Sequence, residues 1–425
     1  MADTSPPDGR RNGAGVRKRK PGRRPTRKPD RKRPFTGKSP GPARTPAAPP
    51  AAAANPATVA PREFTPRFSG PRHAYAAIDL GTNNCRLLIA RPDDENFVVI
   101  DAFSRVVRLG EGLAQTGRLS TAAMDRALGA LKICSDKLRK RNVHLARSVA
   151  TEACRQAENG AEFVARVAQE TGILLDIITA EEEARLAVMG CHKLLEDGPG
   201  PALIFDIGGG STELVLIDST GLDSTGSDSS SPVAMPDGSL GVPRIVDWES
   251  VPWGVVSLSE TVTGTHGDER AERSARLERY AAMRQLVTDS LARFATRLDP
   301  HRAPDLRLLG TSGTVTTLAS IHLDLPQYNR QAVDGLVVNA TDMRAISQRL
   351  SGLSLDERRQ IACVGNERSG LVVAGCAILE AIMDIWPAAR LGVADRGIRE
   401  GILRSLMATE TPRQPLAHQR HTRVH

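Results

Sequence analysis

The sequence predicts an α/β protein built from two related lobes. The first observation is an internal repeat, because the segment 77–90, AIDLGTNNCRLLIA, aligns without a gap on the segment 204–217, IFDIGGGSTELVLI. The second is an alternation of short β-branched apolar runs with longer segments of helical periodicity. A repeat of this length indicates two copies of one structural unit, and we expect their turns to face each other across a cleft.

The stretch 203–217 is predicted to be a buried hairpin, because two apolar runs rich in β-branched residues flank a Gly-Gly-Gly-Ser-Thr turn. Backbone N–H groups that no Cβ covers form concave arrays, and such arrays bind phosphate oxygens. The phosphate-binding candidates in this turn are Gly208, Gly209, Gly210 and Ser211.

Two carboxylates stand at the mouths of this turn. Asp206 precedes the turn and Glu213 follows it. Carboxylates beside phosphate-binding amides would repel the ligand unless a hard divalent cation lay between them, and Mg²⁺ is the usual one, with Mn²⁺ as a substitute. The turn therefore predicts phosphate and metal together, with Asp206 and Glu213 as the metal ligands.

The earlier copy of the turn carries different chemistry at matching positions. Asp79 aligns with Asp206 and is a third candidate metal ligand, the alternative being that it ties down its own turn. Arg86 aligns with Glu213, so it should point into the cleft and neutralise phosphate, with a surface salt bridge as the alternative. Further substrate-binding candidates in this copy are Gly81, Thr82 and Asn83.

The elements expected in the first lobe alternate between strand and helix, with an antiparallel hairpin first and parallel strands afterwards. In chain order they are the hairpin 77–90, a strand pair over 97–109, a helix over 121–139 with Ser120 as its N-cap, a strand over 143–150, mostly helix over 152–170, a strand over 174–178, and a helix from 181 to 195 that leads to the second lobe.

The second lobe begins with the central hairpin and continues with a low-complexity insert that cannot build a core. After the insert we expect a β stretch over 244–258, a charged helix over 267–298, a strand over 306–310, a turn at 311–314 that begins a helix, an apolar helix over 371–386, a strand over 390–394 and a closing helix over 398–407. The expected division is a disordered arm at 1–73, an N-terminal lobe at 74–192, a C-terminal lobe at 193–408 with a flexible insert at 218–242, and a disordered tail at 409–425.

Charge separates the arm from the rest of the chain. Residues 1–73 hold 18 Lys and Arg against 4 Asp and Glu, whereas the remainder holds 39 basic and 45 acidic residues. The arm is also rich in Pro and poor in large apolar side chains, so we expect it to be disordered. It could contact a polyanion such as nucleic acid, an anionic membrane or polyphosphate, or simply be solvated charge.

The six cysteines are scattered without a Cys-x-x-Cys pair, which predicts reduced thiols and a cytoplasmic protein. No apolar run reaches the roughly 18 residues of a membrane span, and the N-terminus has no apolar signal core. The oligomeric state is left open, with a homodimer as one alternative.

The paired turns, together with GTSGT at 310–314, resemble the phosphate motifs of the acetate and sugar kinase, Hsp70 and actin superfamily. Within it, TEACRQAENG at 151–160, TAEEEARLAVMG at 179–190 and DRGIREG at 395–401 resemble the exopolyphosphatase and guanosine pentaphosphate phosphohydrolase (Ppx/GppA) family. The resemblance runs from about 75 to 407 and implies two ribonuclease H-like lobes, as in actin, around a cleft. Longer exopolyphosphatases add a helical domain that resembles HD hydrolases. No His-Asp dipeptide occurs here, so a short, two-lobe member is expected.

The resemblance also implies roles for individual residues. Glu183, the acid before Ala-Arg in the family's E-E-A-R-L segment, would be the catalytic base; without the resemblance, three acids at a helix start would be read as a complement to the helix dipole. Arg155 matches the Arg of the family's T-x-x-x-R-Q-A-x-N segment and would neutralise substrate charge, with a surface salt bridge as the alternative. Backbone amides would come from the third motif, at Gly310, Ser312 and Gly313.

The implied activity is metal-dependent hydrolysis of a terminal phosphoanhydride, namely release of orthophosphate from inorganic polyphosphate. The alternative is 5′-phosphohydrolysis of guanosine pentaphosphate (pppGpp), because both substrates present a terminal anhydride. A kinase would need an ATP pocket and a sugar or acetate site, for which we see no matching segment. A non-catalytic polyanion- or nucleic-acid-binding protein is less favoured, because the acids at Glu183, Asp206 and Glu213 are intact.

Deleting residues 1–70 should raise the KM for long polyphosphate at low salt and leave kcat nearly unchanged, because a flexible cationic arm raises the local concentration of a polyanion. The effect on pppGpp should be small, since pppGpp is too short to bridge arm and cleft. Steady-state kinetics across ionic strength would measure this, and the difference should vanish as the Debye length falls from about 10 Å at 0.1 M to about 3 Å at 1 M salt. An unchanged KM at low salt would exclude the arm as a substrate tether.

Overall fold

The structure is a computed structural model that describes residues 73–93, 97–196, 198, 200–218, 243–263, 272–298 and 306–410. These residues belong to one compact unit of the chain, 65–425. The expectations for the basic arm, for the insert and for the tail fall outside the described residues. Among the described helices, none combines the length and the apolar character that a bilayer crossing requires.

The first sheet has the strand order β3-β2-β1-β4-β5. Its strands are β1 (Ala74–Leu80), β2 (Asn84–Pro92), β3 (Phe97–Val106), β4 (Val143–Ala150) and β5 (Leu175–Ile177). The hairpin and the later parallel pairings agree with the sequence analysis. The strand pair expected over 97–109 is instead the single ten-residue strand β3, because β2 pairs with it antiparallel along its length, with one shift of register between Ile89 and Ala90.

Helices of the first lobe cover one face of this sheet. They are α1 (Leu113–Thr116), α2 (Thr121–Lys140), α3 (Glu152–Gln156) and α4 (Gly160–Thr171). Ser120 caps α2 as predicted, since its side chain accepts from the Ala123 N–H. The helix expected over 152–170 breaks in two because the chain folds back on itself, and a Cβ on Gly160 would lie 2.0 Å from the Cys154 carbonyl oxygen.

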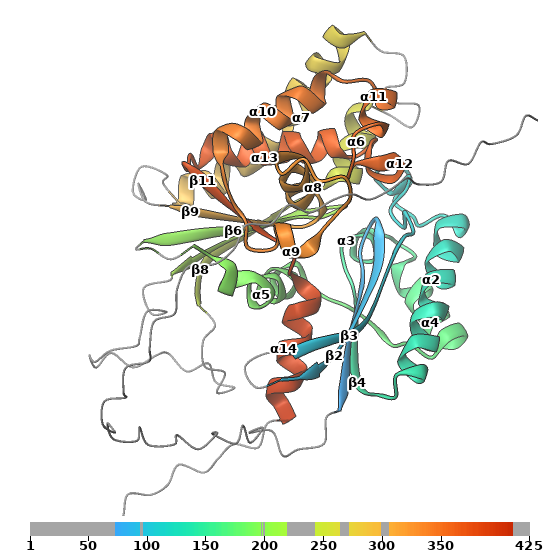
Figure 1. The fold of residues 1–425 in the computed structure, drawn as a ribbon. Coiled ribbons are helices and arrows are strands. Elements are labelled where there is room, and N and C mark those ends of the chain that lie inside the picture. The colour runs from blue at the N-terminus through green and yellow to red at the C-terminus, as the bar shows by residue number, and fades with distance from the viewer. Residues whose placement is uncertain are drawn as a thin grey trace, which may run out of the picture. The chain divides into compact units, whose positions relative to one another are not determined.

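The other face of the first sheet packs against α5 (Ala180–Cys191) and α14 (Ile398–Glu410) (Figure 1). The sequence analysis assigned residues 398–408 to the C-terminal lobe, but Ile402 and Leu403 are buried against the first sheet. This placement corrects that assignment, and the physical reason is the apolar surface that β1 and β2 expose on this side. A short 3₁₀ helix, η1 (His192–Leu194), follows α5.

The second sheet has the strand order β10-β11-β9-β6-β7-β8. Its strands are β6 (Pro201–Ile207), β7 (Thr212–Asp218), β8 (Arg244–Val251), β9 (Arg307–Thr311), β10 (Val337–Asn339) and β11 (Arg390–Ala394). The β stretch expected over 244–258 ends at Val251, and the chain turns into helix α6 (Val255–Thr263).

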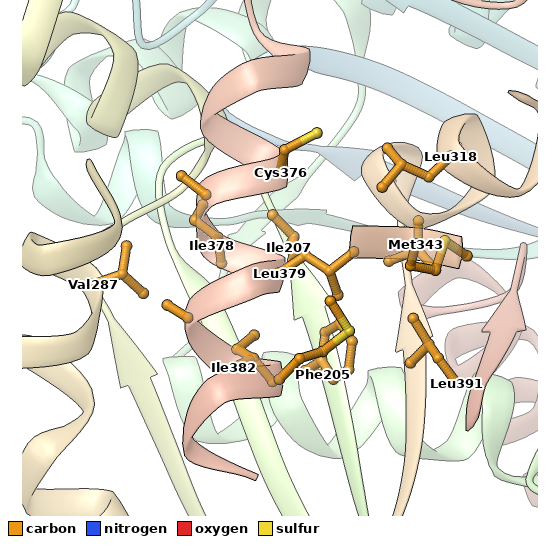
Figure 2. Close-up of a cluster of buried hydrophobic side chains, with 14 of the residues drawn as sticks. Phe205, Ile207, Val287, Leu318, Met343, Cys376, Ile378, Leu379, Ile382 and Leu391 are labelled. Atoms are coloured by element: carbon orange, nitrogen blue, oxygen red, sulfur yellow. The ribbon is translucent and has the colours of Figure 1, made fainter. Parts of the chain in front are cut away.

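The core of the second lobe forms around helix α13 (Val372–Ile385), which the sequence predicted closely. Figure 2 shows Ile378, Leu379 and Ile382 of α13 among side chains from the sheet and the neighbouring helices. Those helices include α7 (Arg273–Leu298), α8 (Gly313–His322) and α10 (Ala340–Gly352). The short helices α9 (Arg330–Val333), α11 (Leu355–Arg359) and α12 (Gly365–Arg368) lie in a region for which no element is predicted.

The internal repeat is confirmed in three dimensions. Asp79 pairs across its hairpin with Arg86, and Asp206 pairs with Glu213 at the matching position of the second hairpin. Both turns close in the same way: the Gly81 N–H donates to Asn84 O at 2.9 Å, and the Gly208 N–H donates to Ser211 O at 3.0 Å.

Helix α5 lies between the two sheets and packs against both. Leu186 and Ala187 contact the first sheet, while Ala184 and Val188 contact the second. Glycines allow α14 to cross α5 at close range, since a Cβ on Gly401 would lie 2.0 Å from the Leu186 carbonyl oxygen. This crossing fixes the direction of α5, whose N-terminus carries the three acids of the predicted catalytic segment.

Gly401→Ala should destabilise the fold by about 1–3 kcal/mol, because the added methyl forces α14 away from α5. Gly129→Ala on α2 is the matched control, since nothing lies within 4 Å of its added Cβ. That control should stabilise by about 0.5–1 kcal/mol through helix propensity. Urea unfolding of both variants measures the difference, and equal stabilities would contradict the close crossing.

Candidate active site

A cavity of about 140 Å³ lies where the two hairpin turns meet. Most residues predicted to form the site line this cavity. They are Asp79, Gly81, Thr82, Asn83, Arg86, Glu183, Asp206, Gly208, Gly209, Gly210, Ser211, Glu213, Ser312 and Gly313. The prediction of facing turns is therefore consistent with the geometry, and only Arg155 and Gly310 of the predicted set do not line the cavity.

The glycine turn touches the turn of the first hairpin directly. A Cβ on Gly209 would lie 2.9 Å from Thr82 Cβ, and one on Gly210 would lie 2.6 Å from Thr82 Oγ1. The glycines are therefore needed for the two turns to approach each other, in addition to exposing amides. The carbonyl oxygens of Gly208 and Gly209 accept from the first N–H groups of α6. Because the Gly208 N–H is bonded to Ser211 O, the N–H groups of this turn that remain for an anion are those that follow Gly208.

Asp79 and Asp206 occupy equivalent places at the ends of β1 and β6. Burial raises the pKa of both carboxyl groups, to about 6 for Asp206, and the Arg86 guanidinium opposes the rise. Within the described residues neither carboxylate accepts a hydrogen bond or forms an ion pair. Buried carboxylates of this kind are costly unless a ligand or cation compensates them.

Glu213 is held by hydroxyl groups. Its Oε1 accepts from Ser211 Oγ at 2.6 Å and from Ser250 Oγ at 3.0 Å. Burial raises the pKa of Glu213 to about 7, and the Asp206 charge adds to the rise while the two serines oppose it. Because both bonds go to Oε1, Oε2 is the oxygen left for a ligand.

Glu183 lies in the first turn of α5, which Thr179 caps. Its side chain is buried, and its Oε2 accepts from Arg155 Nη1 at 3.1 Å. Burial raises the pKa of Glu183 well above its usual value, the Glu213 charge raises it further, and Arg155 opposes both. Its neighbour Glu182 instead pairs with Arg147 and Arg185 outside the cavity.

Arg155 is committed to protein partners and does not line the cavity. Besides Glu183 it binds the Ile178 carbonyl oxygen at 2.8 Å and Glu152 Oε2 through Nε at 2.9 Å. These contacts are of the kind that the salt-bridge alternative describes, and the bond to Glu183 restrains that carboxylate. Contact between Arg155 and substrate stays a prediction. The side chain of Glu152 lines the cavity and was not singled out from the sequence.

The third motif contributes Ser312 and Gly313 at the start of α8. Ser312 has a φ of 94°, and its buried hydroxyl has no hydrogen-bond partner among the residues that the structure describes. Gly310 instead lies inside β9, where a Cβ would lie 2.7 Å from the Phe205 ring and 2.8 Å from Val315. The lack of a side chain at Gly310 thus lets β9 pack closely against Phe205 of β6 and Val315 of α8. The expected contact of its amide with phosphate stays a prediction.

Two arginines approach Gly313 from different elements. A Cβ on Gly313 would lie 3.9 Å from the Arg368 guanidinium carbon and 4.0 Å from an Arg86 nitrogen. Arg368 is fixed by Thr317 Oγ1 at 2.6 Å, and Arg86 has no hydrogen bond or ion pair with a described residue. Arg368 was not predicted, because an isolated arginine in a region without predicted elements carries no sequence signal.

The donor set fits a hard cation bound with few protein ligands. No group of three His, Cys, Asp or Glu side chains is arranged as a ready metal site in the described part of the chain. Mg²⁺, however, usually takes one or two carboxylates and completes its shell with water and substrate phosphates. Asp206 and the free Oε2 of Glu213 meet that requirement, with Asp79 nearby.

A model of the Ppx/GppA phosphatase family matches residues 88–410 of the chain. Exopolyphosphatase 2 of Mycobacterium tuberculosis is 29% identical over 352 residues, which cover 78% of this chain and 98% of that protein. The Aquifex aeolicus member of the Ppx/GppA family has a solved structure that is 26% identical, with a TM-score of 0.61 and coverage of 80% of this chain and 99% of that one. A solved exopolyphosphatase of Cytophaga hutchinsonii, 23% identical with a TM-score of 0.65 over 79% of this chain and 98% of that one, supports the two-lobe fold.

Asp206→Asn should raise the melting temperature in excess chelator at pH 7.5. The folded-state pKa of Asp206 lies near 6, above its ordinary value of 3.8, so the penalty for burying the charge is complete above pH 6 and disappears below about pH 4. Wild type and variant should therefore converge as the pH falls through this window. Circular dichroism melting curves provide the measurement.

Asp101→Asn is the matched control with the opposite sign. Lys137 and Arg141 lower the pKa of Asp101 to about 2, so this carboxylate stabilises the fold above pH 3.8 and the variant should melt lower at pH 7.5. If Asp206→Asn lowered the melting temperature as much as Asp101→Asn does, burial of the Asp206 carboxylate would not destabilise the fold.

Proposed function

The chain belongs to the Ppx/GppA phosphatase family, and we propose that it hydrolyses the terminal phosphoanhydride bond of inorganic polyphosphate in the cavity between the two turns. The observation that carries this proposal is the meeting of four buried carboxylates, the two hairpin turns and Arg86 in one cavity. A buried carboxylate alone would destabilise the fold, and a turn or an arginine alone would not identify a ligand. Together they match a phosphate chain with a bound cation.

Phosphoryl transfer depends mainly on positioning and charge stabilisation. We assign the terminal phosphoryl group to the N–H groups of the two turns, with Arg86 and Arg368 beside it. Glu183 would accept a proton from the attacking water, and its raised pKa makes it a stronger base than an exposed carboxylate. Arg155 would hold Glu183 in one orientation throughout.

Asp206 and Glu213, with Asp79 as a further candidate, would hold Mg²⁺ or Mn²⁺. Such an ion supplies charge neutralisation for the phosphate oxygens. The carboxylates then no longer repel the substrate, which explains why acids and phosphate-binding amides occupy the same cavity.

Polyphosphate is favoured over pppGpp by the lining of the cavity. Within the described residues no Phe, Tyr or Trp lines it, and its apolar lining is aliphatic, with Val255, Leu371 and Val372 among the contributors. Recognition of a purine commonly uses an aromatic stacking partner, and none is offered here. Hydrolysis of pppGpp remains the alternative, because the phosphate-binding groups would serve it equally well.

The test is a side-by-side measurement of orthophosphate release from long-chain polyphosphate and from pppGpp by the purified full-length chain. We expect a higher kcat/KM with polyphosphate, activity with Mg²⁺ or Mn²⁺, and loss of activity in excess chelator. A higher kcat/KM with pppGpp would reverse the substrate assignment. Full activity in chelator would refute the metal argument.

Glu183→Gln should lower kcat by roughly 10² or more, because a positioned general base contributes about that much to the rate. Substrate binding should change little, since Gln has nearly the same shape. Glu182→Gln is the matched control and should keep a near-normal kcat, because Glu182 faces Arg147 and Arg185. An inactive Glu182→Gln beside an active Glu183→Gln would move the assignment by one residue.

A further inference from the structure

Each of the two turns is held from behind by its own supporting segment. Behind the first turn lies the loop after β3: the Val107 and Arg108 N–H groups donate to Asn83 O at 2.8 and 3.0 Å, and the Gly110 N–H donates to Thr82 O at 2.9 Å. The position of the first turn therefore follows the position of this loop.

Helix α6 supports the glycine turn in a similar way. The Val255 N–H donates to Gly208 O at 3.0 Å and the Val256 N–H to Gly209 O at 2.8 Å. Ser257 Oγ donates to Gly210 O at 2.8 Å. The N-terminus of α6 is thus bonded to three successive carbonyl groups of the turn, so a shift of α6 moves the turn.

A single side chain joins these two supports. The Gly112 N–H, at the start of α1, donates to Glu260 Oε1 at 3.0 Å and lies 3.3 Å from Oε2. Gly112 follows the supporting loop by two residues and adopts a left-handed φ of 75°, which turns its N–H toward α6. Glu260 lies near the middle of α6 and is half-buried there.

We propose that Glu260 is a positioning residue that holds the two phosphate-binding turns at their working separation. The contact from Glu260 to Gly112 thus joins the lobes through elements other than those of the α5 and α14 crossing and of the two turns. The two turns are in contact through Gly209 and Thr82. If the bond between Glu260 and Gly112 is lost and the lobes move slightly apart, the turns separate, and the groups that would bind phosphate are divided between them. The predicted change in KM rests on the proposed function, whereas the positioning of the turns by Glu260 does not.

Losing this contact should lower the fraction of molecules in the closed form. The apparent affinity for substrate falls in proportion to that fraction, whereas the bound and closed complex reacts as before. Glu260→Ala should therefore raise the KM for long-chain polyphosphate about three- to tenfold and leave kcat within twofold. Glu260→Gln keeps a side-chain oxygen that can accept from Gly112 and should restore a KM close to that of the wild type.

Thr261→Ala is the matched control, because its exposed hydroxyl bonds only within α6, to Ser257 O. It should leave both constants unchanged. If Glu260→Ala lowers kcat or the melting temperature without raising KM, Glu260 has a structural role and the proposal fails. An unchanged KM in Glu260→Ala overturns it as well.

Hydrogen–deuterium exchange on the metal-free protein gives a readout that does not depend on activity. Glu260→Ala should speed exchange in the segments 107–113 and 81–84 and leave α6 protected. Inorganic tripolyphosphate with Mg²⁺ should restore much of that protection. Faster exchange throughout α6, or none in these segments, would refute the positioning role. If the exchange result holds while the wild type releases no phosphate from polyphosphate, the proposed function fails and the positioning role stands.

Discussion

The burial of four carboxylates in one cavity is the constraint on which the rest of this structure depends. Burial raises the pKa of Asp79, Asp206, Glu213 and Glu183, and like charges add to the rise in several of them. Such an arrangement persists only where the surrounding structure fixes each group. Here hairpin ends fix two, serine hydroxyls fix the third, and a helix start with an arginine fixes the fourth.

The duplicated hairpin distributes charge unequally between the lobes. In the first copy Asp79 faces Arg86 across the strands, so the turn is nearly balanced, whereas in the second copy Asp206 faces Glu213 and the turn is doubly acidic. A divalent cation at the second turn would offset this charge, and Arg86 would neutralise phosphate at the first. On the proposed function, one repeated unit would supply a metal-binding side and a phosphate-binding side through one difference at the matching position.

Much of this site could be predicted from the sequence because it is encoded in short segments. A hairpin turn brings Asp206 and Glu213 together within eight residues, and the repeat places Asp79 and Arg86 by the same local geometry. Most strands of both sheets were predicted for the same reason, since apolar runs and turns are local signals. The three-residue strand β10 was not predicted.

The features that escaped prediction depend on tertiary packing. Arg368 reaches the cavity from a region of short helices without periodic patterning, and Glu260 acts through one contact across 148 residues of sequence. The carboxylates that pair with Arg155 could not be read from its motif, because Glu183 lies 28 residues away in the sequence. Helix α14 was placed with the C-terminal lobe because an apolar helix face does not specify the sheet it packs against.

We propose that phosphate and a divalent metal ion occupy this cavity together, the ion offsetting the repulsion between the carboxylates and the phosphate. Thermal unfolding of the wild type with Mg²⁺, with inorganic tripolyphosphate, and with both tests it directly through linkage. The account predicts that both ligands together raise the melting temperature by more than the sum of their separate effects, and that Asp206→Asn loses this excess. Additive shifts, or full stabilisation by tripolyphosphate in chelator, would contradict it.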